Sequence, residues 1–153
     1  MKKTFWLPMV LMWLMVGIGI SQVAAGDDKK KNDEDAGIQF TEASWAAILK
    51  KAKAEKKVIF LDAYASWCGP CKLLQKNVFT KKEVGDYFNR QFINVKMDME
   101  KGEGPSVAQM YPLEAYPTLF FIDGNGRVLK KVIGYRSPQE LLSIGKGVKA
   151  PAL

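Results

Sequence analysis

Residues 58–72 read VIFLDAYASWCGPCK, an apolar run that leads directly into a Cys-x-x-Cys pair. The nearly continuous apolar segment Val58–Tyr64 is typical of a central parallel strand that is buried on both faces. Cys68 and Cys71 are the only cysteines in the 153-residue sequence, so no second thiol is left for a separate structural disulfide. Two cysteines at this spacing can close a small disulfide on each other and reopen it. Redox cycling is therefore the first hypothesis.

The position of Cys68 between a strand and a helix suits disulfide exchange. The thiolate is the reactive form, and amides and dipole at a helix N-terminus stabilise it. Three residues later, Cys71 returns to the same turn, where it is screened by Cys68 and can resolve a mixed disulfide. Pro70 presets the backbone for the first helical turn, and Gly69 lets a substrate chain pass close to the pair. We predict a catalytic dithiol with Gly69 and Pro70 in the substrate-binding surface.

Metal binding is the main alternative for a Cys-x-x-Cys pair. Structural metal sites need two further ligands, and the sequence has no other cysteine and no histidine. A copper site that uses Met97, Met99 or Met110 is conceivable, although core packing explains these methionines more simply. We expect no metal and no cofactor.

Periodicity predicts the remaining elements. Trp45, Ile48, Leu49 and Ala52 recur at helical spacing up to Lys57, with Thr41 as the expected N-cap. Ser137, Pro138 and Glu140 form the pattern of a capping box that opens a final helix. The other expected elements are helices over 71–78, 83–90 and 105–111, an alternating strand over 92–99, and a hairpin of strands 118–122 and 127–133 around Asp123-Gly124-Asn125-Gly126.

These elements predict an α/β fold. The expected order is β-α-β-α-(α)-β-α-β-β-α, with the folded part starting at Ile38-Gln39-Phe40. It implies a mixed central sheet flanked by helices, with a parallel βαβ unit and then an antiparallel hairpin at one edge.

The N-terminal region has the pattern of an export signal. Residues 1–25 combine a basic start, an apolar stretch that is short for a membrane span, and small residues before a cut near Gly26. The alternative is an uncleaved N-terminal anchor. Residues 26–37 are charged and read as a flexible linker, which leaves 38–153 as the domain. Both alternatives place the domain outside the cytoplasm, where disulfides persist, and we expect the bacterial periplasm.

The formal net charge of +7 comes from lysines spread in pairs along the chain. Such pairs are usually solvated faces, and no nucleic-acid motif accompanies them. We expect no nucleic-acid partner. No added dimerisation segment is evident, so we expect a monomer.

At this point the chain resembles the thioredoxin superfamily. Residues 60–72 look like its active-site strand and helix, and Tyr116-Pro117-Thr118 resembles its cis-proline loop. The resemblance covers roughly residues 38 to 147 and implies the thioredoxin fold, a central mixed β-sheet flanked by helices on both faces.

The resemblance also assigns roles. It makes Cys68 the attacking thiol, Cys71 the resolving thiol, and Asp62 the buried acid that takes the proton from Cys71. A carboxyl in an apolar strand should have a raised pKa, which suits this role. Lys96 aligns with a lysine that pairs with that acid; the simpler alternative is a surface lysine on an alternating strand.

The same resemblance predicts the substrate-binding loop. Pro117 would be cis and present the backbone of Tyr116 to a substrate strand, while Trp67 would flank the site as an apolar contact. Tyr116 is bulkier than the aliphatic residue that thioredoxins usually carry there, which argues against broad substrate tolerance.

The chain departs from many thioredoxins after Cys71. The helix after Cys71 lacks the proline that kinks it in many thioredoxins, and Asn77-Val78-Phe79-Thr80 is similar to a segment in the periplasmic C-terminal domain of transmembrane disulfide reductases. Gly69 and Pro70 between the cysteines resemble the pair in reducing thioredoxins, so the resemblance implies an exported thiol–disulfide oxidoreductase that reduces protein disulfides, with a transmembrane disulfide reductase as electron donor. The alternatives are a disulfide oxidase or isomerase, and a thioredoxin-fold adaptor or metal-binding module.

Overall fold

The computed structural model describes residues 36–149, so the expected signal or anchor over 1–25 and most of the linker over 26–37 lie outside the described residues. In the described part, no helix is long and apolar enough to span a membrane. This part contains five helices and four strands, in the order α1 (Trp45–Glu55), β1 (Val58–Tyr64), α2 (Gly69–Asn77), α3 (Lys82–Gln91), β2 (Phe92–Asp98), α4 (Gly104–Met110), β3 (Thr118–Ile122), β4 (Val128–Ile133) and α5 (Pro138–Gly147).

The four strands form one mixed sheet in the spatial order β2-β1-β3-β4. β1 pairs with β2 in parallel and with β3 in antiparallel orientation, and β4 closes an antiparallel hairpin with β3. The predicted parallel unit and edge hairpin are both present. β1 is central, and its first six residues are buried, as expected for a strand covered on both faces.

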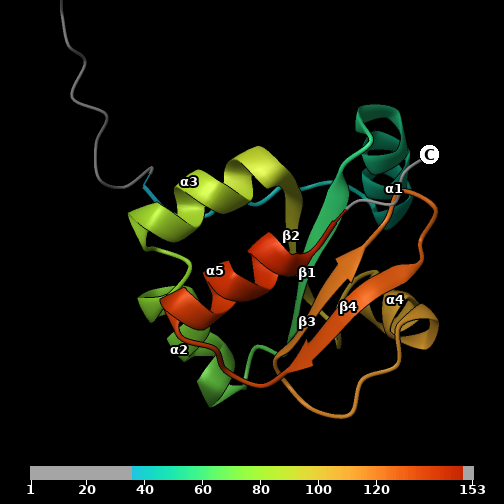
Figure 1. Ribbon diagram of the computed structural model, residues 1–153. Coiled ribbons are helices and arrows are strands. Elements are labelled where there is room, and N and C mark those ends of the chain that lie inside the picture. Colours follow the sequence, from blue (N-terminus) through green and yellow to red (C-terminus); the bar gives the residue numbers. More distant parts are fainter. Residues whose placement is uncertain (1–35, 150–153) are drawn as a thin grey trace, which may run out of the picture. The chain divides into compact units, whose positions relative to one another are not determined.

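Two hydrophobic cores lie on opposite faces of this sheet. Phe60 of β1 faces the core covered by α2, α3 and α5, which contribute Leu74, Phe88 and Leu141. The neighbouring residues Ile59 and Leu61 face the other core, to which α1 and α4 contribute. Figure 1 shows α2, α3 and α5 together on one side of the strands. The expected architecture, a central mixed sheet with helices on both faces, is confirmed.

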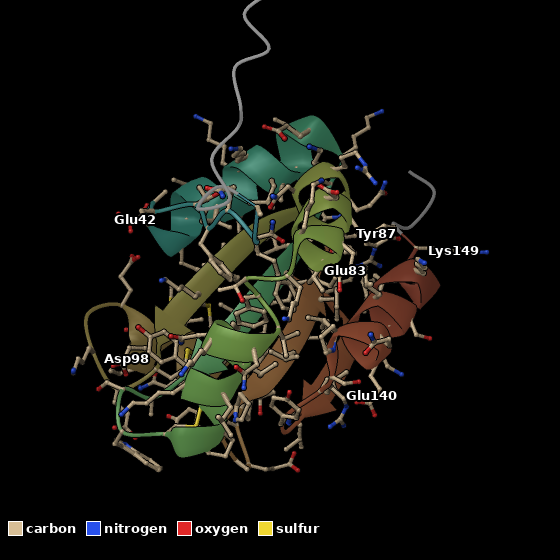
Figure 2. All side chains as sticks on the ribbon, turned by 90° about the vertical axis from the view of Figure 1, so that its left-hand side faces the viewer. Glu42, Glu83, Tyr87, Asp98, Glu140 and Lys149 are labelled. Carbon is tan, nitrogen blue, oxygen red and sulfur yellow. A yellow bond between two sulfur atoms is a disulfide. The ribbon has the colours of Figure 1, made fainter. Side chains whose placement is uncertain are left out.

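The capping box at the start of α5 is present as predicted. The Ser137 hydroxyl accepts a hydrogen bond from the Glu140 amide, and the Glu140 carboxylate accepts one from the Ser137 amide. These bonds satisfy backbone donors that the first turn leaves open. Figure 2 labels Glu140 at this end of α5 and Lys149 beyond the other end.

The beginning of the domain differs from the sequence prediction in two ways. Residues 38–40 form no strand; a single backbone hydrogen bond, from the Thr41 amide to the Asn94 carbonyl at 2.8 Å, joins this segment to β2. The N-cap of α1 is Ser44 rather than Thr41, with its hydroxyl accepting from the Ala47 amide at 3.3 Å. Thr41 lies three residues before Ser44, and its amide is bonded to β2.

The predicted alternation along β2 is also incomplete. Residues 92–95 are all buried, and exposure begins only at Lys96. Ile93 and Val95 face the core of α1 and α4, while Phe92 faces the opposite core. Both faces of this half of β2 are therefore covered, which removes the exposed positions that alternation requires.

Candidate active site

Cys68 and Cys71 form a disulfide at the start of α2, with their Cα atoms 5.4 Å apart. Figure 2 shows its yellow bond beside that helix. Cys68 is the N-cap residue, with extended backbone angles, and its Sγ accepts a hydrogen bond from the Cys71 amide at 3.1 Å. Gly69 begins the helix, and Pro70 stands in its first turn, where a missing amide hydrogen costs nothing. The structure thus places the Cys68 sulfur at the positive end of the helix.

Exposure does not separate the two cysteines in this oxidised state. Their exposed fractions are 2% for Cys68 and 1% for Cys71, whereas the sequence analysis expected only Cys71 to be screened. The two sulfur atoms screen each other, and Ala65, Tyr64 and Tyr116 pack around them. What distinguishes Cys68 is its place at the helix N-terminus, where its sulfur already accepts an amide hydrogen.

Asp62 is a fully buried carboxyl on the central strand. Side chains alternate along β1, so Asp62 shares the face of Phe60, which is the face that α2 covers. Neither carboxyl oxygen has a hydrogen-bond partner among residues 36–149. Burial raises the pKa of Asp62 to about 7, because the charged form loses its hydration, while the positive charge of Lys96 offsets part of this rise. The group can therefore exchange protons near neutral pH.

Lys96 lies opposite Asp62 in the register between β1 and β2. The side chain of Lys96 is exposed, and no ion pair joins the two residues within the described part of the chain. Its ammonium nitrogen instead lies 5.5 Å from the centre of the Phe40 ring. Lys96 thus acts on Asp62 through its charge and not through a direct contact.

The expected substrate loop lies beside the disulfide. The Tyr116–Pro117 peptide bond is cis, Pro117 is buried, and Tyr116 contacts the core around the cysteines. The rings of Tyr116 and Trp67 meet edge to face, with their centres 5.8 Å apart. Trp67 is 67% exposed, far more than a core tryptophan would be. The two rings form an aromatic surface next to Cys68.

The loop after β2 supports this surface, which the sequence analysis did not anticipate. The Trp67 indole donates a hydrogen bond to Glu100 at 2.9 Å, and the Lys101 ammonium donates one to the Ser66 hydroxyl at 2.9 Å. Each contact joins residues more than thirty positions apart in the sequence. No local spacing marks such pairs. Phe40 was likewise expected only at the start of the folded part.

Across residues 36–149, no three His, Cys, Asp or Glu side chains come together as possible metal ligands. The chemistry that the arrangement supplies is a pair of thiols on one helical turn, with a titratable carboxyl on the sheet beneath that helix.

Comparison with known proteins agrees with this geometry. Residues 45–149 match the family model of the thioredoxin-like domain. The H-type thioredoxin 2 of Nicotiana tabacum is 32% identical over 114 residues, which cover 74% of this chain and 90% of that protein.

Two solved structures extend the comparison. A candidate disulphide isomerase from Bacteroides thetaiotaomicron is 46% identical, with a TM-score of 0.63 over 74% of this chain and 96% of that one. The oxidised C-terminal domain of DsbD from Neisseria meningitidis superposes with a TM-score of 0.56, covering 66% of this chain and 89% of its own. At 21% identity, that second likeness shows the fold alone.

The family match, the relatives and the Cys68–Cys71 pair at the start of α2 lead to one assignment. The chain belongs to the thioredoxin-like family and is a thiol–disulfide oxidoreductase.

Proposed function

We propose that this protein is an exported reductase of protein disulfides. The observation that carries the proposal is the buried carboxyl of Asp62 on the sheet face beneath the Cys68–Cys71 helix. It offers a proton acceptor close to neutral pH on the same side of the sheet as the thiol that must be deprotonated.

The reaction starts from the reduced pair. The Cys68 thiolate attacks one sulfur of a substrate disulfide, so a Cys68–substrate disulfide forms and the other substrate sulfur leaves as a thiolate, which takes up a proton. Cys71 then gives its proton to the Asp62 carboxylate, and its sulfur attacks Cys68 Sγ. The Cys68–substrate bond breaks and the second substrate thiolate leaves. The substrate gains two electrons, and Cys68 and Cys71 lose two electrons and end as a disulfide.

The surroundings of the pair favour the reducing direction. A strong oxidant needs a reduced form that is specially stabilised, as when the thiol pKa is lowered far below its ordinary value. Gly69 and Pro70 add no charge and no side-chain donor between the cysteines. A carboxylate at Asp62 disfavours a nearby thiolate by repulsion between like charges. The carboxylate thus destabilises the thiolate form of the reduced pair, and Gly69 and Pro70 do not offset this effect, which lowers the reduction potential.

Export and the electron donor complete the proposal. The basic start, apolar stretch and small residues over 1–25 support delivery to the bacterial periplasm. A reductant in an oxidising compartment needs electrons from elsewhere, and a transmembrane disulfide reductase supplies electrons of this kind. The fold likeness to the DsbD C-terminal domain is compatible with such a partner.

The test is the reduction potential of the Cys68–Cys71 pair in the purified protein, equilibrated against glutathione buffers of known ratio. A value near or below that of thioredoxin, about −270 mV, supports a reductase. A value near that of a strong periplasmic oxidant, about −120 mV, overturns the reducing direction.

Disulfide isomerisation is a second candidate, because the 46% identical relative is described as a candidate disulphide isomerase. Isomerisation needs no net electron transfer, so attack by Cys68 followed by release through a substrate thiol is sufficient. A Cys71→Ser variant that still restores activity to a substrate with scrambled disulfides would favour this candidate. A variant that only accumulates mixed disulfides would favour the reductase.

A further inference from the structure

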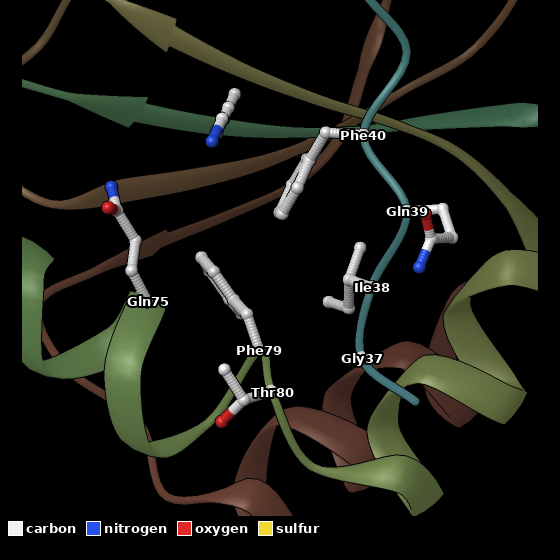
Figure 3. A pocket seen from close by; sticks show the side chains of 8 residues that line it. Gly37, Ile38, Gln39, Phe40, Gln75, Phe79 and Thr80 are labelled. Atoms are coloured by element: carbon white, nitrogen blue, oxygen red, sulfur yellow. The ribbon is translucent and has the colours of Figure 1, made fainter. Parts of the chain in front are cut away.

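A pocket of about 310 Å³ lies beside the sheet, between the segment before α1 and the end of α2. Figure 3 shows Phe40 and Phe79 next to each other among the residues that line it, with Gln75 of α2 nearby. Lys96 of β2 also lines the pocket. Since Lys96 is in register with Asp62, the pocket borders the strand position that carries the buried acid.

The ring of Phe40 lies beside the charge of Lys96 in this pocket. The Lys96 nitrogen lies 5.5 Å from the centre of the Phe40 ring, within the range of a cation–π contact. The Phe40 ring itself packs edge to face on Phe79, with their centres 5.5 Å apart. An exposed lysine without an ion pair would otherwise sample many rotamers in solvent. The ring restricts these positions and keeps the ammonium group at the pocket.

Backbone hydrogen bonds on both sides of Phe40 fix the position of its ring. On one side, the Ile38 amide donates to the Phe79 carbonyl at 2.7 Å and the Gln39 amide donates to Asn89 Oδ1 at 2.8 Å. On the other side, the Thr41 amide donates to the Asn94 carbonyl at 2.8 Å. The segment is held against α3 and β2, so the position of the Phe40 ring is fixed by these backbone bonds as well as by the packing of the ring.

We propose that Phe40 is a positioning residue for disulfide exchange: it keeps the Lys96 charge beside Asp62, the acid that exchanges protons with Cys71. The inference rests on the proposed function for the role of Asp62 and goes beyond it by adding Phe40. The positive charge of Lys96 already opposes the effect of burial on the pKa of Asp62. If the ring is lost, Lys96 moves into solvent, its charge is screened, and Asp62 holds its proton more strongly.

Few other charged groups face Asp62, so the effect of the Lys96 charge on the pKa of Asp62 can be measured apart from theirs. Three of the elements packed against this face, β3, α3 and α5, turn apolar side chains toward it. The titratable groups on this face are Tyr64 on β1, Lys96 and Asp98 on β2, Tyr87 on α3, Lys130 on β4, and the thiols of Cys68 and Cys71 on α2 once the disulfide is reduced.

The experiment is a double-mutant cycle on the full-length oxidised chain. The carboxyl carbon of Asp62 is titrated by NMR in the wild type, Phe40→Leu, Lys96→Met and the double variant, with Asp62→Asn to assign the signal. Phe40→Leu is expected to raise the pKa of Asp62 by a measurable fraction of a pH unit, because the Lys96 charge that lowers this pKa becomes more strongly screened by solvent. In the Lys96→Met background, Phe40→Leu is expected to cause no further shift.

Phe40→Tyr is the matched control, because it keeps the ring and is expected to retain the wild-type titration of Asp62. If Phe40→Leu fails to fold, the titration of Asp62 in Phe40→Tyr is compared with that in the wild type instead. An unchanged or lowered pKa in Phe40→Leu would overturn the proposal, and so would an equal shift with and without Lys96, which would mark a purely structural effect. The titration uses the oxidised protein, so its result is independent of the direction of electron transfer. A reduction potential of the Cys68–Cys71 pair near −120 mV would overturn the proposed reductase function but would not affect the test of Phe40.

Discussion

Asp62 and Lys96 lie directly opposite each other on neighbouring parallel strands, yet no ion pair joins them in the described part of the chain. Asp62 is fully buried and its carboxyl oxygens lack hydrogen-bond partners there, while Lys96 is exposed beside Phe40. A direct pair would favour the carboxylate and lower its pKa. The observed separation leaves the carboxyl with a pKa near 7, where it can both take up and release a proton.

Burial of Asp62 predicts a stability that falls as the pH rises. Its pKa increases from 3.8 to about 7 on folding, so between these values the folded state binds more protons than the unfolded state. The stabilisation is complete below about pH 4 and is lost as the pH passes through 7, an effect on the order of 4 kcal/mol. Asp62→Asn should flatten this dependence and raise the free energy of unfolding at pH 8.5. Urea unfolding of the oxidised protein at pH 5, 7 and 8.5 measures both effects. Equal pH dependence in the two proteins would contradict the prediction.

Removing the second cysteine should trap the first intermediate. In Cys71→Ser, Cys68 still attacks a substrate disulfide, but no neighbouring thiol displaces the product. We expect stable mixed disulfides that are visible on non-reducing gels and dissolve on addition of a reductant. Cys68→Ser is the control, because its remaining thiol lies inside the helix and lacks the N-cap position. Trapping by Cys68→Ser instead would reverse the assigned roles of the two thiols.

The aromatic surface of Trp67 and Tyr116 should act in binding and not in the chemical step. Trp67 is 67% exposed and contacts Tyr116, so Trp67→Ala should raise KM for a protein disulfide about tenfold, as expected for an exposed aromatic anchor. The rate with a small aromatic disulfide should change little. Steady-state kinetics with both substrates separates these cases. Met110→Ala, at a residue 54% exposed on α4, is the matched control and should leave both rates unchanged.

Close packing at Gly85 should hold the start of the domain in place. A Cβ atom at Gly85 of α3 would collide with the Ala36 carbonyl oxygen, a rigid backbone group. Gly85→Ala should therefore lower the free energy of unfolding by about 1–3 kcal/mol, the usual cost of overpacking. At Gly147 of α5 a Cβ atom meets nothing within 4 Å, so Gly147→Ala should be neutral or slightly stabilising. Urea unfolding of the two variants makes the comparison; equal stabilities would argue against tight packing at Gly85.

The sequence by itself determined the features that depend on neighbouring residues. The apolar run of β1, the capping box of α5 and the placement of Cys68 at the start of α2 each follow from residues a few positions apart. Local backbone preference and burial govern such elements, and both can be read from a short window of sequence. Residues 60–72 and Tyr116–Thr118 resemble the thioredoxin superfamily, and this resemblance predicted the fold.

Only the tertiary structure decided the contacts that tune the site. The N-cap is Ser44 rather than Thr41, whose amide bonds to β2, and the expected strand at 38–40 reduces to that one bond. The Glu100 contact to Trp67 and the Phe40 contact to Lys96 likewise join distant segments. Register, side-chain rotamers and long-range packing fix these pairs, because the energy of each depends on where the chain brings two groups together in space, which residue order alone does not specify.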